Sequence, residues 1–201
     1  MKTIATILLT LAIMSIKAQE KFSAGIQLEG IQSTPENLYS YPAKMDKEFG
    51  GGAGVFFSAN IWKSLSANTG INYRFITYDE FDKNVGYPVG YPTLDGYIYK
   101  QNYLAVPVNL RGVFFKNWLF VEPGIELTWM LGNEVKDPKY EMLWKIGAGS
   151  KIGKFNYSLN YLWGSKEQSD ILNPGPDFRV IVYKSRMVQL KVSYPLWSKC
   201  K

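Results

Sequence analysis

Apolar and polar side chains alternate with a period of two along most of this chain. Between residues 65 and 75, the odd-numbered positions carry only Leu, Ala, Thr, Ile, Tyr and Phe, whereas the even-numbered positions carry Ser, Asn, Gly and Arg. We call each such set of alternate positions in a strand a parity. Such alternation is typical of β-strands, whose successive side chains point to opposite faces. The polar parity is too charged and glycine-rich for a solvent surface alone, and the apolar parity is too aromatic to be left in water. The pattern therefore indicates a transmembrane β-barrel, with apolar side chains toward lipid and polar ones inside.

Eight segments share this alternation and predict eight strands, near residues 22–32, 51–62, 65–75, 98–114, 119–129, 140–152, 155–163 and 180–197. Phe56 is an apolar exception on the polar parity of the second segment. Lys184 and Arg186 are cationic exceptions on the apolar parity of the last segment. They lie near its loop end, where long side chains can reach lipid head groups.

The connections between these segments alternate in length. Residues 63–64, 116–117 and 153–154 form short turns, whereas residues 33–48, 79–97, 132–139 and 165–179 form longer connections rich in Pro, Gly and acidic residues. Outer-membrane barrels combine short periplasmic turns with longer external loops. The chain is therefore expected to be an all-β protein, an eight-stranded antiparallel up-and-down transmembrane β-barrel with both termini in the periplasm.

Two of the short turns fix registers that agree with the parity. A turn at residues 116–117 that pairs Phe115 with Trp118 places Arg111 directly opposite Glu122, so both charges face inward as a cross-strand pair. A turn at residues 153–154 aligns two further inward pairs, Lys151 with Asn156 and Gly149 with Ser158.

The N-terminus has the features of a cleaved signal peptide. Lys2 supplies positive charge, residues 4–16 are mostly apolar, and Ala18 precedes a plausible cleavage site before Gln19. We expect residues 1–18 to be a signal peptide and residues 19–201 to be one outer-membrane β-barrel domain. No later segment approaches the roughly 20 apolar residues that a membrane helix needs.

The distribution of charge and the cysteine content limit the partners and the disulfides that the chain could have. The formal net charge is +6, and subtracting Lys2 and Lys17 leaves +4, spread over strands, turns and loops. Because nothing concentrates this charge, no nucleic-acid partner is expected. The one cysteine, Cys200, follows the last predicted strand, so no intrachain disulfide can form.

Two segments carry a resemblance to a known family. The run from Tyr103 to Val108 reads YLAVPV, and the run from Val121 to Ile125 reads VEPGI. With the short turn between them, they resemble the PorT-like or "porin family" outer-membrane β-barrel proteins of Gram-negative bacteria. Glu126 stands where a further glycine is common in that family. The resemblance implies an eight-stranded barrel and little about activity, although some members are linked to a dedicated protein-secretion system.

The chain has no histidine, which excludes most chemistry known in barrels. Barrel enzymes that cleave acyl chains or proteins resemble one another in using a histidine as general base, and a Ser-His-Asp triad cannot be built here. Zinc sites are disfavoured for the same reason. Residues 50–54 read GGGAG without a following Gly-Lys-Ser/Thr, so they are no P-loop. These glycines are better explained by strand curvature or by large neighbouring side chains. We expect no enzymatic activity, no metal and no cofactor.

The polar parity predicts a set of nine charged interior residues: Glu29, Arg74, Arg111, Glu122, Glu126, Glu141, Lys145, Lys151 and Lys191. They could line an ion-conducting lumen or form a gate. The favoured interpretation is a plugged interior, because a barrel of eight strands is only wide enough for its own side chains. Four acids and five bases nearly balance, as buried charges require. Lys151 lies closest to a short turn, where it can stay in water.

Aromatic residues near both strand ends predict two interfacial girdles and hence contact with outer-membrane lipid. They are Trp62, Phe115, Trp118 and Phe155 beside the short turns, and Tyr78, Trp129, Tyr140, Trp144 and Trp163 toward the long loops.

Four loop tyrosines are candidate contacts to a protein or glycan. They are Tyr39 and Tyr41 in the first long loop, and Tyr87 and Tyr91 in a repeated Gly-Tyr-Pro motif in the second. The simpler explanation is that these tyrosines pack the loops over the barrel mouth.

The sequence favours a non-enzymatic outer-membrane barrel with structural or interaction roles for its external loops. The alternatives are a small-solute channel and an accessory barrel of a protein-secretion system. A soluble lipocalin-like binder, with the apolar parity turned into a ligand cavity, is a further alternative.

Overall fold

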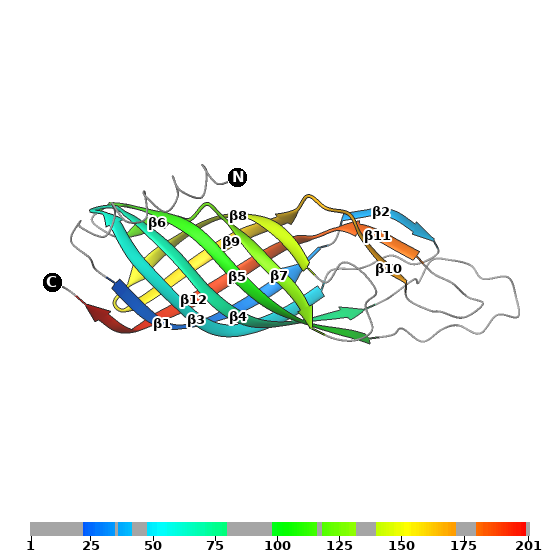
Figure 1. The fold of residues 1–201 in the computed structure, drawn as a ribbon, viewed down its shortest axis with the longest axis horizontal. Helices are drawn as coiled ribbons and strands as arrows, with labels where there is room; N and C mark the ends of the chain where they lie inside the picture. Colours follow the sequence, from blue (N-terminus) through cyan, green and yellow to red (C-terminus); the bar gives the residue numbers. More distant parts are fainter. Residues whose placement is uncertain are drawn as a thin grey trace, which may run out of the picture.

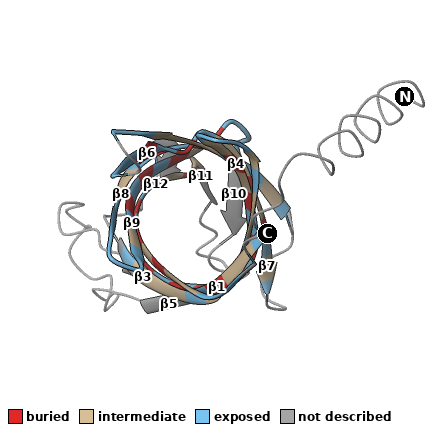
Figure 2. Cartoon of the chain, turned by 90° about the vertical axis from the view of Figure 1, so that its left-hand side faces the viewer, coloured by how far each residue is buried: buried red, intermediate tan, exposed pale blue. Residues whose placement is uncertain are grey.

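The wall of the molecule is a single antiparallel sheet that closes on itself (Figure 1). The computed structural model describes residues 22–34, 36–41, 48–79, 98–115, 118–131, 140–171 and 180–199. The wall strands are β1 (Phe22–Ser33), β3 (Glu48–Trp62), β4 (Leu65–Asp79), β5 (Ile98–Phe114), β6 (Leu119–Val121) continued by β7 (Gly124–Leu131), β8 (Tyr140–Ile152), β9 (Phe155–Gly164) and β12 (Arg186–Lys199). Each pairs with its neighbour in sequence, and β12 pairs with β1, so the predicted eight-stranded barrel is confirmed. Figure 2 shows the closed ring end-on.

The period-two alternation determines which side chains face out and which face in. The outward parity of the wall is exposed and strongly apolar, with Leu28, Phe57, Ile71, Leu110 and Ile146 among its members. The inward parity is buried and mostly polar. Because the apolar side chains lie outside, the soluble lipocalin-like alternative, which needs them around an internal cavity, is wrong.

Tight turns at one end of the barrel set the registers. Gly153 has a φ of 60°, a conformation that glycine adopts without strain, and the turn that it begins pairs Ile152 with Phe155. At the neighbouring turn the backbone N–H of Trp118 donates to the carbonyl of Phe115, 3.2 Å away. The aligned pairs Gly112–Val121 and Asn109–Gly124 confirm the register expected for that hairpin.

The fifth predicted strand is interrupted at Glu122 and Pro123, which divide it into β6 and β7. Proline has no N–H to donate to a neighbouring strand. The hydrogen bonding nevertheless continues, because the N–H of Leu110 donates to the Pro123 carbonyl at 2.9 Å. Glu122 and Gly147 exchange both of their backbone hydrogen bonds, at 2.8 and 3.1 Å. The wall is therefore closed across the proline.

A second, three-stranded sheet lies beyond the long-loop end of the barrel (Figure 1). It consists of β2 (Glu36–Tyr41), β10 (Gln168–Ile171) and β11 (Val180–Lys184), in the order β10–β11–β2. The sequence-based assignment of residues 33–48 and 165–179 to loops is therefore wrong in part. The last predicted strand is also divided, because β11 belongs to this sheet and only β12 belongs to the wall.

Both ends of the described barrel lie at the short-turn end, where Phe22 of β1 pairs with Lys199 of β12. In the described part of the chain, no helix is long and apolar enough to cross a membrane. The expected signal peptide, residues 1–18, lies outside the described residues.

Candidate functional site

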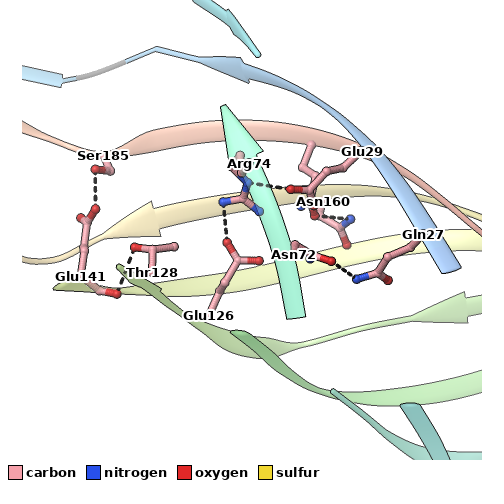
Figure 3. Close-up of polar contacts among 10 residues, drawn as sticks. Gln27, Glu29, Asn72, Arg74, Glu126, Thr128, Glu141, Asn160 and Ser185 are labelled. Carbon is pink, nitrogen blue, oxygen red and sulfur yellow. Dashed lines mark hydrogen bonds and ion pairs between the residues drawn. The ribbon is translucent and has the colours of Figure 1, made fainter. Parts of the chain in front are cut away.

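Arg74 lies at the centre of the barrel interior, between two carboxylates (Figure 3). Its Nε is 2.7 Å from Oε1 of Glu29 on β1, and one terminal nitrogen is 2.7 Å from Oε1 of Glu126 on β7. All three side chains are at most 1% exposed. The guanidinium thus links two strands that are not neighbours of each other in the wall, which a single planar group with several donors can do.

Glu122 is the centre of a second group of contacts toward the short-turn end. Its Oε1 accepts from Arg111 at 3.0 Å and from the side-chain amide of Asn68 at 3.3 Å. Its Oε2 lies 3.5 Å from the ammonium of Lys191. The direct pair of Arg111 with Glu122, expected from the hairpin register, is therefore confirmed. Arg111 also lies over the Phe120 ring, 4.1 Å from its centroid.

Lys145 is a buried cation without a direct ionic contact. Its residue exposure is 3%, and no ion pair within 4 Å includes it among the residues that the structure describes. It interacts at longer range with the carboxylates of Glu122 and Glu126 and with the ammonium of Lys191. The middle of the barrel therefore holds four cations, on Arg74, Arg111, Lys145 and Lys191, and three carboxylates, on Glu29, Glu122 and Glu126.

Amide side chains connect these charges to the rest of the interior. Gln189 donates to Glu29 and accepts from Asn160, whose amide nitrogen is 3.0 Å away. Gln27 donates to Asn72, which lies two positions from Arg74 toward the short-turn end of β4 (Figure 3). We define the interior network as the seven charged residues above together with Gln27, Asn68, Asn72, Asn160 and Gln189. Its members come from every wall strand except β3.

Glycines on β3 make the room that this network occupies. A Cβ at Gly52 would lie 2.6 Å from Oε1 of Glu29, and a Cβ at Gly54 would lie 2.1 Å from Oδ1 of Asn72. Any larger residue would displace these side chains. The expectation that the glycine-rich run accommodates large neighbours, rather than a phosphate, is confirmed at these two positions. Phe56, the apolar exception on the same strand, packs against Gly25 in the same way.

Two of the nine predicted interior residues lie outside the network. Glu141 lies toward the long loops, where its Oε2 accepts from the Ser185 hydroxyl at 2.8 Å and its backbone carbonyl accepts from Thr128 at 3.2 Å (Figure 3). Lys151 is exposed beside the turn at residues 153–154. The prediction that Lys151 belongs to the interior charges is therefore wrong. A side chain on the inward parity lies in water when it is at the rim of the barrel.

An apolar layer closes the interior above the network, and the sequence-based reasoning missed it. It consists of buried side chains at the long-loop end of six wall strands: Ile31, Ile76, Tyr103, Leu143, Leu162 and Met187. Met130 packs against it, and Gly50 of β3 leaves space beside Ile76. On five strands the apolar residue is two positions from a network residue, as Ile76 is from Arg74 and Leu143 is from Lys145. This common spacing is the signal that could have revealed the layer from sequence.

The two cations on the outward parity near the loop end are paired with protein rather than free for lipid. Arg186 contacts the carboxylate of Glu36 and donates to the Gly164 carbonyl at 2.8 Å. The ammonium of Lys184 lies 3.9 Å from Glu167. The expectation that these cations reach head groups is therefore revised. Arg186, the first residue of β12, instead joins the start of β2 to the end of β9.

The candidate loop tyrosines are only partly within the described residues. Tyr39 and Tyr41 lie on β2, opposite Val182 and Val180 of β11, and not in a loop as expected. Tyr87 and Tyr91 lie outside the described residues. The described residues also contain no group of three or more His, Cys, Asp and Glu residues able to hold a metal ion.

The chain matches no protein-family model and no curated protein. Similar solved structures include the outer membrane protein AlkL, at 10% identity over 89% of this chain and 90% of that chain, with a TM-score of 0.48. Ail of Yersinia pestis is similar at 13% identity over 86% and 98% of the two chains, with a TM-score of 0.39. The β domain of the Bordetella autotransporter BrkA is similar at 9% identity over 86% and 99%, with a TM-score of 0.38. Identities and scores this low give no basis for transferring a function.

Proposed function

We propose that this chain is a non-enzymatic integral outer-membrane β-barrel whose interior is closed by its own side chains and whose long-loop end serves structural or interaction roles. The observation that carries the proposal is the inverted distribution of polarity. The outward face of the wall is exposed and apolar, whereas the interior contains the paired charges of the network. Bilayer hydrocarbon is the solvent that suits such an outer face, and a closed barrel leaves no unpaired strand edge in it.

Girdle residues support the same environment. At the short-turn end Trp62, Phe115 and Trp118 are 75%, 78% and 70% exposed, and at the other end Tyr140 and Trp144 are 62% and 45% exposed. Amphipathic aromatic rings favour the head-group region of a membrane. With the short turns in the periplasm, as in bacterial barrels generally, both termini lie there.

The closed interior is supported by the network and the apolar layer together. An eight-stranded barrel has an interior that side chains can fill. Six of the seven charged residues of the network form direct ion pairs, and the apolar layer offers water and ions few polar contacts because the hydroxyl of Tyr103 is bonded to Gln101. Membership of the PorT-like group and an accessory role in protein secretion are narrower assignments that fit within this proposal.

Membrane extraction and electrophoretic heat-modifiability test the location. The full chain is expected to sediment with the outer membrane, to need detergent for release, and to migrate differently before and after heating. A chain that stays soluble without detergent would contradict the proposal.

Planar-bilayer recordings test the closed interior. We expect little steady conductance from the wild-type chain. Reproducible single-channel steps that change in Arg111→Gln or Glu122→Gln would instead establish a conducting lumen.

Photo-crosslinking in intact cells from Tyr87 and Tyr91 tests the interaction role, and recovery of no specific protein or glycan partner would count against it.

A further inference from the structure

A groove with a volume of about 570 Å³ opens on the outer face of the barrel near the short-turn end. Its sides are large outward side chains, Leu119 and Val121 from β6 and Tyr157 and Leu159 from β9. Its floor is formed by the small outward side chains of Ala148 and Ser150 on β8, which lies between those strands. The volume lies in the range of about 300–1,000 Å³ found for sites that bind small molecules.

The strand register explains why the groove forms at this place. Ala148 lies directly between Val121 and Leu159, and Ser150 lies directly between Leu119 and Tyr157. Two successive rows across the wall therefore have a small residue flanked by two large ones. A gap of this kind costs the surrounding side chains part of their dispersion contacts unless another molecule fills it.

The end of the groove at the rim combines aromatic and cationic residues. Phe115, which also lines the groove, is 78% exposed at the turn. On the other side the Phe155 ring contacts the Tyr157 ring, with 6.2 Å between centroids, and the Tyr194 ring, with 5.1 Å. Lys151 and Lys154, both exposed, follow the floor residue Ser150 along the chain.

We propose that the groove binds one acyl chain of an anionic phospholipid, with the lipid phosphate against Lys151 and Lys154. This inference rests on the proposed function, since it requires the outward face to meet lipid. The sides and floor of the groove are almost entirely apolar and suit a hydrocarbon chain. Lys151 and Lys154 follow Ser150 along the chain at the short-turn end, where the lipid head group would lie, and lysines near a membrane surface attract anionic head groups.

Chain packing and charge have separate roles in this site. Lipid tails are as apolar as the groove, so an acyl chain gains no hydrophobic driving force when it enters the groove. Binding must therefore be favoured by van der Waals packing that depends on the shape of the groove. Charge then selects the head group. The site is therefore expected to distinguish an anionic phospholipid from a zwitterionic one.

Photolabelling in vesicles tests the site on the intact chain. The probes are phosphatidylglycerol and phosphatidylcholine that each carry a diazirine on one acyl chain, and labelled peptides are mapped by mass spectrometry. We expect phosphatidylglycerol to label β6, β8 and β9 severalfold more than β3 and β4. Equal labelling around the barrel would overturn the inference.

Two sets of variants separate groove and head group. Ala148→Leu fills the floor and should reduce labelling of β8 and β9 severalfold, and Ser150→Leu provides an independent second filling. The matched control is Ala53→Leu, also outward and small but on β3, four strands away around the wall. It should leave that labelling unchanged. Unchanged labelling in both groove-filling variants would overturn the inference.

The double variant Lys151→Gln/Lys154→Gln should abolish the preference for phosphatidylglycerol over phosphatidylcholine, and a retained preference would overturn the head-group assignment. Each protein is first checked for the heat-modifiable folded band. A wild-type chain that does not float with the vesicles would contradict the proposed function itself, whereas an inserted barrel with uniform labelling contradicts the groove alone.

Discussion

Arg74 is the residue on which the interior depends most. Its side chain is 1% exposed and pairs with two carboxylates that are equally buried. Transfer of these three charges from water costs several kcal/mol per ion, and close pairing offsets that cost. Among the residues that the structure describes, one guanidinium nitrogen of Arg74 and Oε2 of Glu126 have no hydrogen-bond partner, so the compensation is incomplete even in the native barrel.

Replacement of Arg74 should be strongly destabilising. Arg74→Met leaves Glu29 and Glu126 buried without their cation, and the free energy of unfolding should fall by about 3–5 kcal/mol. Urea unfolding of the barrel in lipid vesicles, followed by tryptophan fluorescence, measures the change. The double variant Arg74→Met/Glu126→Gln removes one of the stranded charges and should recover part of the loss. If the single variant unfolds at the wild-type urea concentration, the ion pairs do not stabilise the barrel.

Gly147 tests the idea that glycines make room for polar side chains. A Cβ at this position would lie 1.9 Å from Oδ1 of Asn160, so Gly147→Ala should cost about 1–3 kcal/mol through overpacking. Asn160→Ser in the same chain should restore much of the stability. Gly30→Ala is the matched control, because nothing lies within 4 Å of a Cβ there. Equal effects of the two alanine substitutions in the unfolding assay would contradict this explanation.

At the scale of the strand, the parity of side chains was sufficient to predict the wall. A shift of one residue would turn every outward Leu or Ile inward, so the faces and the registers of two hairpins followed from the pattern. The β2 and β10 strands were missed because they are short and lie in segments rich in Pro, Gly and acidic residues, and β11 was assigned to the last wall strand. Their pairing also joins segments distant in sequence, which local alternation does not report.

Pairing of β1 with β12 closes the wall and can be tested by crosslinking. Leu28 lies directly opposite Val192, so Leu28→Cys/Val192→Cys, with Cys200→Ser, should form a disulfide on oxidation. The oxidised chain should retain a compact, faster-migrating form on a denaturing gel after heating. Leu28→Cys/Leu190→Cys is the control, because Leu190 lies opposite Gly30 and is offset by two residues. Equal or better crosslinking in the control would show a shifted register.

At the scale of the whole molecule, the interior has two zones whose side chains differ in polarity. The interior network occupies the middle of the barrel, and the apolar layer lies between it and the long loops. The charged zone could be predicted, apart from Glu141 and Lys151, because charged residues are rare in the strands and are easily recognised. The apolar layer was missed because it contributes one residue to each of six strands, and the common spacing of these residues from the charged ones becomes clear only when the strands are aligned.

The apolar layer, rather than the charges, should be the main barrier to ions. The triple variant Ile76→Ser/Leu143→Ser/Leu162→Ser makes this layer polar and smaller, and should raise conductance in planar bilayers clearly above the wild-type level. Arg111→Gln should leave conductance near that level. Leu159→Ser on the outward face controls for a general loosening of the wall. If the triple variant stays silent while remaining folded, the network alone closes the barrel.

Closure between β1 and β12 also has a consequence for how the molecule is made. Glu29 and its partner Gln189 are 160 positions apart in the chain, so their contact forms only after nearly all of the barrel has been synthesised. Contacts between such distant residues slow folding. Until they form, both terminal strands present free edges that can pair with other chains. The nascent protein is therefore most vulnerable to aggregation immediately before its last strand joins its first.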